Sequence, residues 1–259
     1  MNPYASESVW IVGGTQGIGL ALAEQLSRQG AQLTLLARNR DRLAQEAARL
    51  GCQQRSLDVG DADQVEEVLG DLLAQQGPPG LFCNTAGLAL PGYLEDLSVV
   101  DLDLMNRVNY LGTAYCCRMV APAMVRQGRG QILNTSSLAG LFGLYGYTGY
   151  CASKFAVVGF CEALRRELQG SGVGVSCLCP PNTRTPGLEQ ENLRKPPEVL
   201  AQEEKAAVLE PADVARYTLA RLPSNPRWII PSLDGRLAHQ LARWAPWALD
   251  WILRRPRAR

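Results

Sequence analysis

Short apolar runs alternate along this chain with longer segments in which apolar residues recur at helical spacing. Each run is bounded by turns or loops, which predicts a buried strand. We expect strands at 9–12, 32–37, 53–57, 81–83, 132–135, 173–178 and 228–230, and helices at about 18–29, 41–50, 61–76, 98–127, 150–170 and 211–222. Strands that alternate with helices predict an α/β fold, a doubly wound parallel sheet of about seven strands with helices on both faces.

One domain accounts for most of the 259 residues, because no repeat and no low-complexity linker divides them. We place this domain at residues 1–235. Within it, residues about 186–210 are rich in charge and proline and follow the carboxyl end of a strand, where α/β proteins place ligand lids. The remaining residues, 236–259, form a basic, tryptophan-rich C-terminal extension.

The formal net charge of +1 conceals an asymmetry between these two parts. A nearly neutral chain has no overall field that would recruit nucleic acid, so we expect no nucleic-acid partner. The extension has one acid, Asp250, and is therefore +5 while residues 1–235 sum to −4, because it holds six arginines: Arg236, Arg243, Arg254, Arg255, Arg257 and Arg259.

Apolar residues recur along the extension at three- and four-residue steps, and Pro246 is expected to kink or split the helix that they predict. The apolar positions are Leu237, Leu241, Trp244, Ala248 and Ile252, with Trp247 and Trp251 beside them. Tryptophan with arginine on an amphipathic segment suits peripheral contact with a membrane surface. A helix that packs on the domain or on a second subunit explains the same pattern, so both interpretations stay open.

The composition excludes several classes of chemistry. A single histidine, His239, which we expect at the surface, excludes zinc hydrolases and most Ser-His-Asp enzymes. The eight cysteines form no CxxC motif, so reduced, buried thiols are favoured over disulfides and no metal site is expected. No leader-like segment and no run of ~18 apolar residues is present. We therefore expect a cytoplasmic protein, with peripheral membrane contact only through residues 236–259.

A glycine-rich turn joins the first expected strand to the first expected helix. Glycine lets backbone N–H groups approach a pyrophosphate at the positive end of a helix, because no Cβ blocks the approach. The turn lies between a strand and a helix, as such a site requires, and therefore predicts nucleotide binding. Its candidate binding residues are Gly13, Thr15, Gln16, Gly17, Ile18 and Gly19.

The G-x-x-x-G-x-G spacing of this turn resembles that of the short-chain dehydrogenases/reductases, and the resemblance extends over nearly the whole chain. It implies a Rossmann-type fold and a nicotinamide cofactor. It also implies a homodimer or homotetramer, because the family's helices corresponding to 98–127 and 150–170 commonly form a four-helix interface.

The end of the second strand indicates which nicotinamide cofactor to expect. Where an NAD-preferring protein offers an acid to the ribose 2′-hydroxyl, this chain has Arg38, with Arg42 one helical turn further on. Arginine suits a 2′-phosphate, so we expect NADP(H), although a solvated helix face explains Arg42 equally well. The resemblance assigns an adenine contact to Asp58, and it implies further cofactor contacts at Asn84, Ala86, Gly87, Pro180 and Thr185.

Tyr150 and Lys154 are four residues apart in an expected helix and therefore lie on one face of it. The Lys154 ammonium can lie under the Tyr150 hydroxyl and, together with a bound cofactor, lower its pKa from about 10. Two nearby tyrosines, Tyr145 and Tyr147, have no lysine four residues on. We predict that Tyr150 is the proton donor and that Lys154 supports it.

Two further catalytic residues follow from the resemblance. The family's Ser-to-Tyr spacing assigns Ser137 to a hydrogen bond with the substrate carbonyl, and Ser136 should point the opposite way because side chains alternate along a strand. Asn109, within the helix expected at 98–127, matches the family's helical asparagine that holds a proton-relay water.

A narrower resemblance concerns residues 179–187, with Glu191-Asn192 and Lys195-Pro196 beyond them. This segment, with Pro180-Pro181, looks like the 3-ketodihydrosphingosine reductase subgroup, which implies NADPH-dependent reduction of the 3-keto group of a sphingoid base precursor. A hydrophobic lipid ketone is therefore the expected substrate. Apolar residues expected around its pocket are Leu88, Leu90, Leu138, Leu141, Phe142 and Leu144, with Leu188, Val199 and Leu200 in the lid.

Two alternatives remain beside this interpretation. Another hydrophobic carbonyl, such as a steroid, a retinoid or a 3-oxoacyl group, would be reduced by the same catalytic residues. A non-catalytic NADP-sensing protein on the same fold would be expected to lack Ser137, Tyr150 or Lys154, and all three are present.

Overall fold

A parallel sheet forms the centre of the molecule. The computed structural model describes residues 4–203 and 207–253, and within them seven parallel strands follow the order β3-β2-β1-β4-β5-β6-β7. The doubly wound α/β prediction is confirmed, and every expected strand ends within two residues of the observed one. The strands are β1 (Ser8–Val12), β2 (Gln32–Ala37), β3 (Gln53–Ser56), β4 (Leu81–Asn84), β5 (Gly130–Thr135), β6 (Val173–Leu178) and β7 (Trp228–Ile229).

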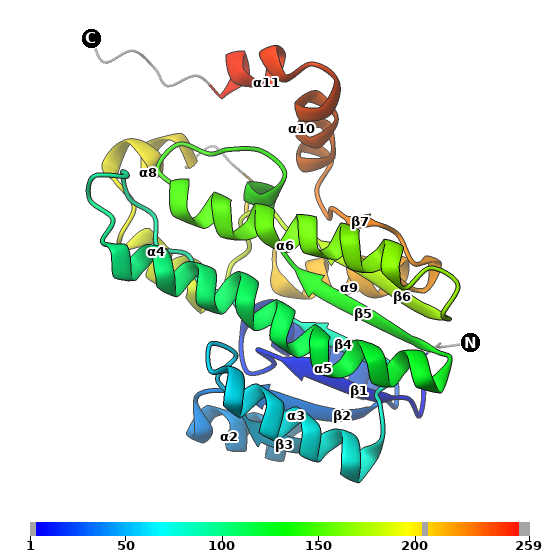
Figure 1. Ribbon diagram of the computed structural model, residues 1–259. Helices are drawn as coiled ribbons and strands as arrows, with labels where there is room; N and C mark the ends of the chain where they lie inside the picture. Colours follow the sequence, from blue (N-terminus) through cyan, green and yellow to red (C-terminus); the bar gives the residue numbers. More distant parts are fainter. Residues whose placement is uncertain (1–3, 204–206, 254–259) are drawn as a thin grey trace.

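Helices cover both faces of the sheet, because successive side chains of a strand point to opposite faces. On β1, Val9 and Ile11 belong to one core, whereas Trp10 and Val12 belong to the other. In Figure 1, α5 and α6 cross in front of the sheet. The first core is completed by α1 (Gly17–Arg28), α2 (Arg40–Leu50) and α9 (Pro211–Arg221), and the second by α3 (Ala62–Gln76), α5 (Gly112–Gln127) and α6 (Thr148–Glu167).

The helix expected at 98–127 is not one α-helix. It consists of α4 (Val99–Met105), a π-helical segment (Asn106–Leu111) and α5. A π-helical turn holds one more residue than an α-helical turn, and the apolar pattern on either side stays helical, so the sequence carries no sign of it. Asn109 is fully buried in this segment.

The lid region predicted at about 186–210 contains two short helices, α7 (Pro186–Asn192) and α8 (Pro197–Glu203). A bridge between Thr183 and Leu209 joins the two ends of the region beside the body of the domain. Proline opens each helix, as the N-terminal turn tolerates. The boundaries at 186–210 and 235, and the role of this region as a lid, stay predictions.

The C-terminal extension forms two helices that project from the body in Figure 1. These are α10 (Leu233–Trp244) and α11 (Pro246–Ile252), so Pro246 splits the helical segment as predicted. Among the residues that the structure describes, no helix is long and apolar enough to span a bilayer. Four of the predicted basic positions lie outside the described residues: Arg254, Arg255, Arg257 and Arg259.

The histidine and cysteine predictions have different outcomes. His239 is half-buried rather than at the surface, because α10 turns its ring edge-on to Trp228 with ring centroids 6.0 Å apart. Burial lowers the pKa of His239. All eight cysteines are free thiols, and all are buried except Cys52, which is partly exposed.

Candidate active site

The glycine-rich turn is held between β1, α1 and the loop that follows β4. Gly13 and Gly17 have φ angles of +77° and +55°, which favour glycine. A Cβ on Gly19 would lie 2.3 Å from the Gly13 carbonyl oxygen, and one on Gly13 would lie 2.8 Å from the Ala86 nitrogen. The turn therefore requires glycine, and it leaves the N-terminus of α1 free to receive an anion. Gln16 and Ile18 face the adjoining cavity, whereas Thr15 is buried.

Asn84 holds the loop after β4 in place through two hydrogen bonds. Its amide nitrogen donates to Thr113 Oγ1 at 3.0 Å, and its Oδ1 accepts from the Ala86 nitrogen at 3.3 Å. Gly87 then passes close to two of the predicted catalytic residues, since a Cβ there would lie 3.1 Å from both Asn109 Oδ1 and Lys154 Nζ. The predicted cofactor segment thus borders the site through its backbone.

Two arginines and one acid follow the ends of β2 and β3. Arg38 lines the cavity, is 63% exposed, and lies 3.9 Å from a carboxylate oxygen of Asp58. Asp58 also accepts from the Gly60 nitrogen at 2.9 Å, which fixes its orientation. Arg42 donates instead to Gln16 of the glycine-rich turn. The two guanidinium groups thus sit at one end of the site and are open to an anionic group.

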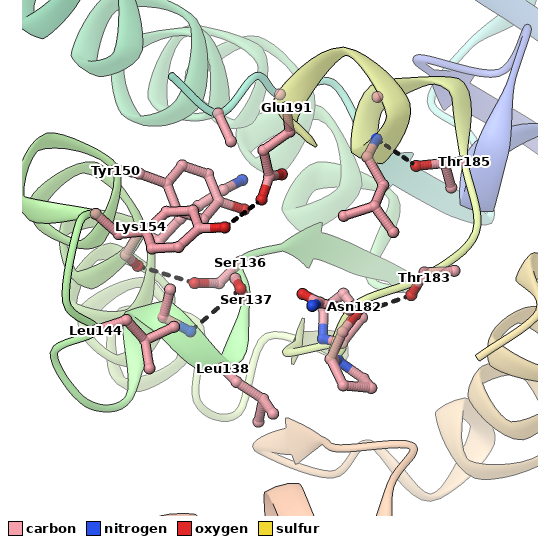
Figure 2. A pocket seen from close by; sticks show the side chains of 18 of the residues that line it. Ser136, Ser137, Leu138, Leu144, Tyr150, Lys154, Asn182, Thr183, Thr185 and Glu191 are labelled. Atoms are coloured by element: carbon pink, nitrogen blue, oxygen red, sulfur yellow. Dashed lines mark hydrogen bonds between the residues drawn. The ribbon is translucent and has the colours of Figure 1, made fainter. Parts of the chain in front are cut away.

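Ser137, Tyr150 and Lys154 meet further along the site, as Figure 2 shows. The Ser137 hydroxyl lies close enough to Tyr150 to lower the pKa of its phenol. Lys154 Nζ lies 5.8 Å from the centroid of the Tyr150 ring and donates to the Thr135 carbonyl at 3.1 Å. The Ser136 hydroxyl donates instead to the main-chain carbonyl of Lys154 at 2.9 Å, and the choice of Ser137 over Ser136 stays a prediction.

The electrostatics of Tyr150 differ from the sequence prediction. Burial raises the pKa of Tyr150, and the negative charge of Glu191 raises it further, while the hydrogen bond from Ser137 lowers it. Burial also lowers the pKa of Lys154 to about 8. In the protein without cofactor, the charge of Lys154 therefore does not compensate for the rise in the Tyr150 pKa that burial causes. Tyr150 keeps its proton at neutral pH, which is the state that a proton donor needs.

Asn109 uses its whole side chain to hold the loop after β4. Its Oδ1 accepts from the Leu88 nitrogen, and its Nδ2 donates to the Leu88 carbonyl and to Ser153 Oγ, each at 2.9 Å. Asn109 is thus next to the catalytic residues, and its role in holding a relay water stays a prediction.

Pro180 and Thr185 connect the lid region to this site. The Pro180 carbonyl accepts from the Leu138 nitrogen at 3.1 Å, next to Ser137. Thr185 caps α7, accepting from the Leu188 nitrogen at 3.1 Å. The Thr185 methyl group lies 2.8 Å from where a Gly17 Cβ would be. The lid region thus begins directly over the glycine-rich turn.

A cavity of about 800 Å³ joins the two ends of the site. It runs from Gln16 and Arg38 past Ser137 and Tyr150 into an apolar part. Of the expected apolar residues, Leu141 packs into a core instead and Leu200 is not part of the lining. The apolar part is formed by Leu88, Leu90, Leu138, Phe142, Leu144, Leu188 and Val199.

Sequence reasoning missed a buried charged cluster at the lid. Tyr147 Oη lies 2.6 Å from Glu191 Oε1 and 2.8 Å from Glu203 Oε1. The Lys195 side chain is 1% exposed, and its Nζ lies 3.2 Å from Glu191 and 2.7 Å from Glu203. Tyr147 has no lysine four residues further along the helix. Lys195 of the lid region reaches it instead, with Nζ 5.9 Å from the centroid of the Tyr147 ring. Nothing in the local sequence marks this contact.

Comparison with known proteins assigns the family. The model of the short chain dehydrogenases matches residues 7–196, and this chain belongs to that family. Members bind NAD or NADP, and the Cβ-free turn and the cavity beside it fit such a dinucleotide.

Particular relatives narrow the comparison. The chain is 39% identical to the 3-ketodihydrosphingosine reductase of Bos taurus and 37% identical to the 3-dehydrosphinganine reductase of Danio rerio, over 80% and 82% of its length. It spans 66% and 67% of the length of those two relatives. A solved short chain dehydrogenase/reductase from Burkholderia phymatum in complex with NAD matches 100% of this chain and 99% of its own, with 28% identity and a TM-score of 0.83.

Proposed function

We propose that this protein reduces the ketone of a long-chain lipid with NADPH, converting 3-ketodihydrosphingosine to dihydrosphingosine in sphingolipid biosynthesis. The observation that carries the proposal is the meeting of Ser137, Tyr150 and Lys154 in one cavity, between an arginine-bearing end and an apolar end. The relatives named 3-ketodihydrosphingosine reductase support the choice of substrate.

The geometry gives each catalytic residue a role. NADPH, when bound, would supply a hydride to the carbonyl carbon. Tyr150 donates its proton to the carbonyl oxygen as negative charge develops there, and Ser137 holds that oxygen through a second hydrogen bond. Lys154 stabilises the phenolate that remains and would also hold the nicotinamide ribose. Tyr150 is only partly exposed, so a substrate bound in the cavity would exclude water from its hydroxyl.

Arg38 and Arg42 support NADPH over NADH. Both guanidinium groups lie beyond the end of β2, and neither meets an acid closely, since Arg38 is 3.9 Å from Asp58 and Arg42 contacts the neutral Gln16. A 2′-phosphate would offer both arginines a charge-assisted partner. The 2′-hydroxyl of NADH offers no such partner and would leave Arg38 only its distant pair with Asp58.

The C-terminal extension supports delivery of the substrate from a membrane. Trp244 and Trp247 are 76% and 75% exposed, and Trp251 is exposed beside them. Asp250 and Leu253 of the same extension border the cavity. A tryptophan-rich surface beside the mouth of an apolar cavity fits a lipid that leaves a membrane to be reduced. The second part of the proposal is therefore peripheral membrane contact through residues 236–259.

We also propose a homodimer or homotetramer, built on α4–α5 and α6. Phe155 on α6 is 44% exposed and Val125 on α5 is 37% exposed, which supports burial of these helices against a second copy.

Reduction of candidate ketones by the purified protein tests the activity. NADPH consumption is measured with 3-ketodihydrosphingosine, with a steroid ketone and with a 3-oxoacyl ester, and is repeated with NADH. We expect consumption with the first substrate and NADPH; preference for the steroid or the 3-oxoacyl ester would favour the alternative carbonyls. Tyr150→Phe should bind NADPH without turnover, and Tyr115→Phe on α5 is the matched control. Turnover above a few per cent in Tyr150→Phe would contradict the assigned role.

A further inference from the structure

The charged cluster at the lid has more negative than positive charge. Among the described residues it combines two carboxylates, Glu191 and Glu203, with one ammonium, Lys195, and its formal charge is therefore −1. All three side chains are largely withdrawn from water, with exposed fractions of 15%, 21% and 1%. A charge that is withdrawn from water is stable only with good partners. The cluster is therefore suited to receive a further cation.

The hydrogen bonds show which carboxylate lacks donors. The single hydrogen of the Tyr147 hydroxyl cannot be donated to both carboxylates at once. Glu203 has additional donors, Lys195 at 2.7 Å and Asn182 at 2.8 Å. Both groups that reach Glu191, Tyr147 and Lys195, contact its Oε1. No hydrogen bond from the part of the chain that the structure describes reaches Glu191 Oε2.

Glu191 is also the carboxylate that faces the reacting groups. In Figure 2 its side chain extends from the lid toward Tyr150 and Lys154. The Tyr147 ring, whose hydroxyl contacts Glu191, lies 6.0 Å from the Tyr150 ring between centroids. The charge of Glu191 is felt at the Tyr150 hydroxyl, whose pKa it raises. A ligand whose carbonyl is held by Ser137 and Tyr150 therefore presents its neighbouring atoms to Glu191.

We propose that Glu191 binds a primary ammonium group carried on the carbon next to the substrate's ketone. This inference rests on the proposed function and deepens it, because 3-ketodihydrosphingosine carries such an ammonium whereas steroids, retinoids and 3-oxoacyl groups do not. The ammonium would give Glu191 a charge-assisted hydrogen bond and would neutralise the cluster. Glu191 is then the residue that distinguishes long-chain amino ketones from other long-chain ketones.

The test compares two ketones in three proteins. The ketones are 3-ketodihydrosphingosine and its desamino counterpart, which has the same chain, ketone and hydroxyl but no amine. The proteins are the wild type, Glu191→Gln, and Glu189→Gln as the matched control. Glu189 is on the same helix, is exposed and does not line the cavity, so the control removes the same charge outside the site.

The readout is the ratio of kcat/KM for the amino ketone to kcat/KM for the desamino ketone. Comparing this ratio between proteins cancels the different intrinsic reactivity of the two ketones. Loss of a hydrogen bond to a charged group is worth about tenfold or more, so the ratio should fall by about that factor in Glu191→Gln. It should be unchanged in Glu189→Gln.

Two results would overturn the inference. The first is an unchanged ratio in Glu191→Gln, either with both activities retained or with an equal loss for both ketones, which would indicate that Glu191 only positions the lid. A wild type that reduces both ketones equally well would leave the proposed reductase standing and remove the role of the ammonium. A wild type that reduces neither ketone would overturn the proposed function itself.

A measurement on the wild type alone covers the case in which Glu191→Gln does not fold. Dodecylamine and dodecanol are compared as inhibitors of desamino ketone reduction, because they share an alkyl chain and differ in the charged group. We expect the amine to inhibit at a concentration about tenfold lower than the alcohol. Equal inhibition by the two compounds would contradict an ammonium site.

Discussion

Lys154 is a buried ammonium group. The proposed reaction requires it, but its burial makes the folded protein less stable. Burial lowers the pKa of Lys154 from its usual 10.5 to about 8. A tenfold difference in proton affinity corresponds to about 1.4 kcal/mol, so holding the charged side chain costs the folded state about 3 kcal/mol at pH 7. We predict that Lys154→Met abolishes turnover and raises the free energy of unfolding.

The net gain is smaller than this cost, because the substitution also removes a hydrogen bond. The Thr135 carbonyl loses the donor that now lies at 3.1 Å. Since Thr135 lines the cavity, water can reach that carbonyl and the loss is about 1 kcal/mol. Lys154→Met should therefore be more stable by about 2 kcal/mol at pH 7, which raises Tm by about 4–8 °C in a domain of this size.

The stability difference between Lys154→Met and the wild type should depend on pH in a defined direction. Below pH 8 Lys154 is protonated in both the folded and the unfolded state, and its full cost is present. Between pH 8 and 10.5 the unfolded state binds the proton and the folded state does not, so wild-type stability rises relative to Lys154→Met. Thermal and urea unfolding of both proteins without cofactor, from pH 7 to 10, measures the difference. A variant no more stable at pH 7, or a difference independent of pH, would refute this reasoning.

Three further predictions concern the cofactor and the extension. Arg38→Ala should raise KM for NADPH by about tenfold or more, through loss of a charge-assisted hydrogen bond, and leave KM for NADH unchanged; equal changes in both KM values would contradict a 2′-phosphate contact. In Gly19→Ala the new Cβ would lie 2.3 Å from the Gly13 carbonyl oxygen, so we expect about 1–3 kcal/mol of lost stability and loss of NADPH binding, measured by urea unfolding and cofactor fluorescence. Replacing Trp244 and Trp247 together with alanine should reduce flotation with anionic liposomes; undiminished flotation would argue against membrane contact.

The parts of the site that the sequence predicted are those with a local signal. Tyr150 and Lys154 are joined by one helical turn, and the glycine-rich turn lies between adjacent elements, so spacing along the chain is enough to place them. Most strands of the sheet were predicted because buried parallel strands are continuous apolar runs, although the edge strand β3 is polar and more exposed.

The parts that the sequence did not predict depend on which surfaces meet. Glu191 and Lys195 lie in a charge-rich segment that resembles a solvated surface, and only their contacts with Tyr147 and Glu203 withdraw them from water. The raised pKa of Tyr150 in the protein without cofactor was not predicted, because a count of neighbours along the helix includes Lys154 but not the loss of water. The π-helical turn at Asn109 inserts one residue without disturbing the apolar pattern on either side.

The strand order also determines when during folding the protein can become active. β1 pairs with β4 rather than with β3, and β4 in turn pairs with β5, so the glycine-rich turn and Ser137 come together only after distant segments have joined in parallel. Parallel pairing across long connections is intrinsically slow, whereas α1 to α6 can form from local contacts. In a refolding experiment, helical circular dichroism should therefore recover before NADPH binding, and binding of the dinucleotide reports completion of the central sheet.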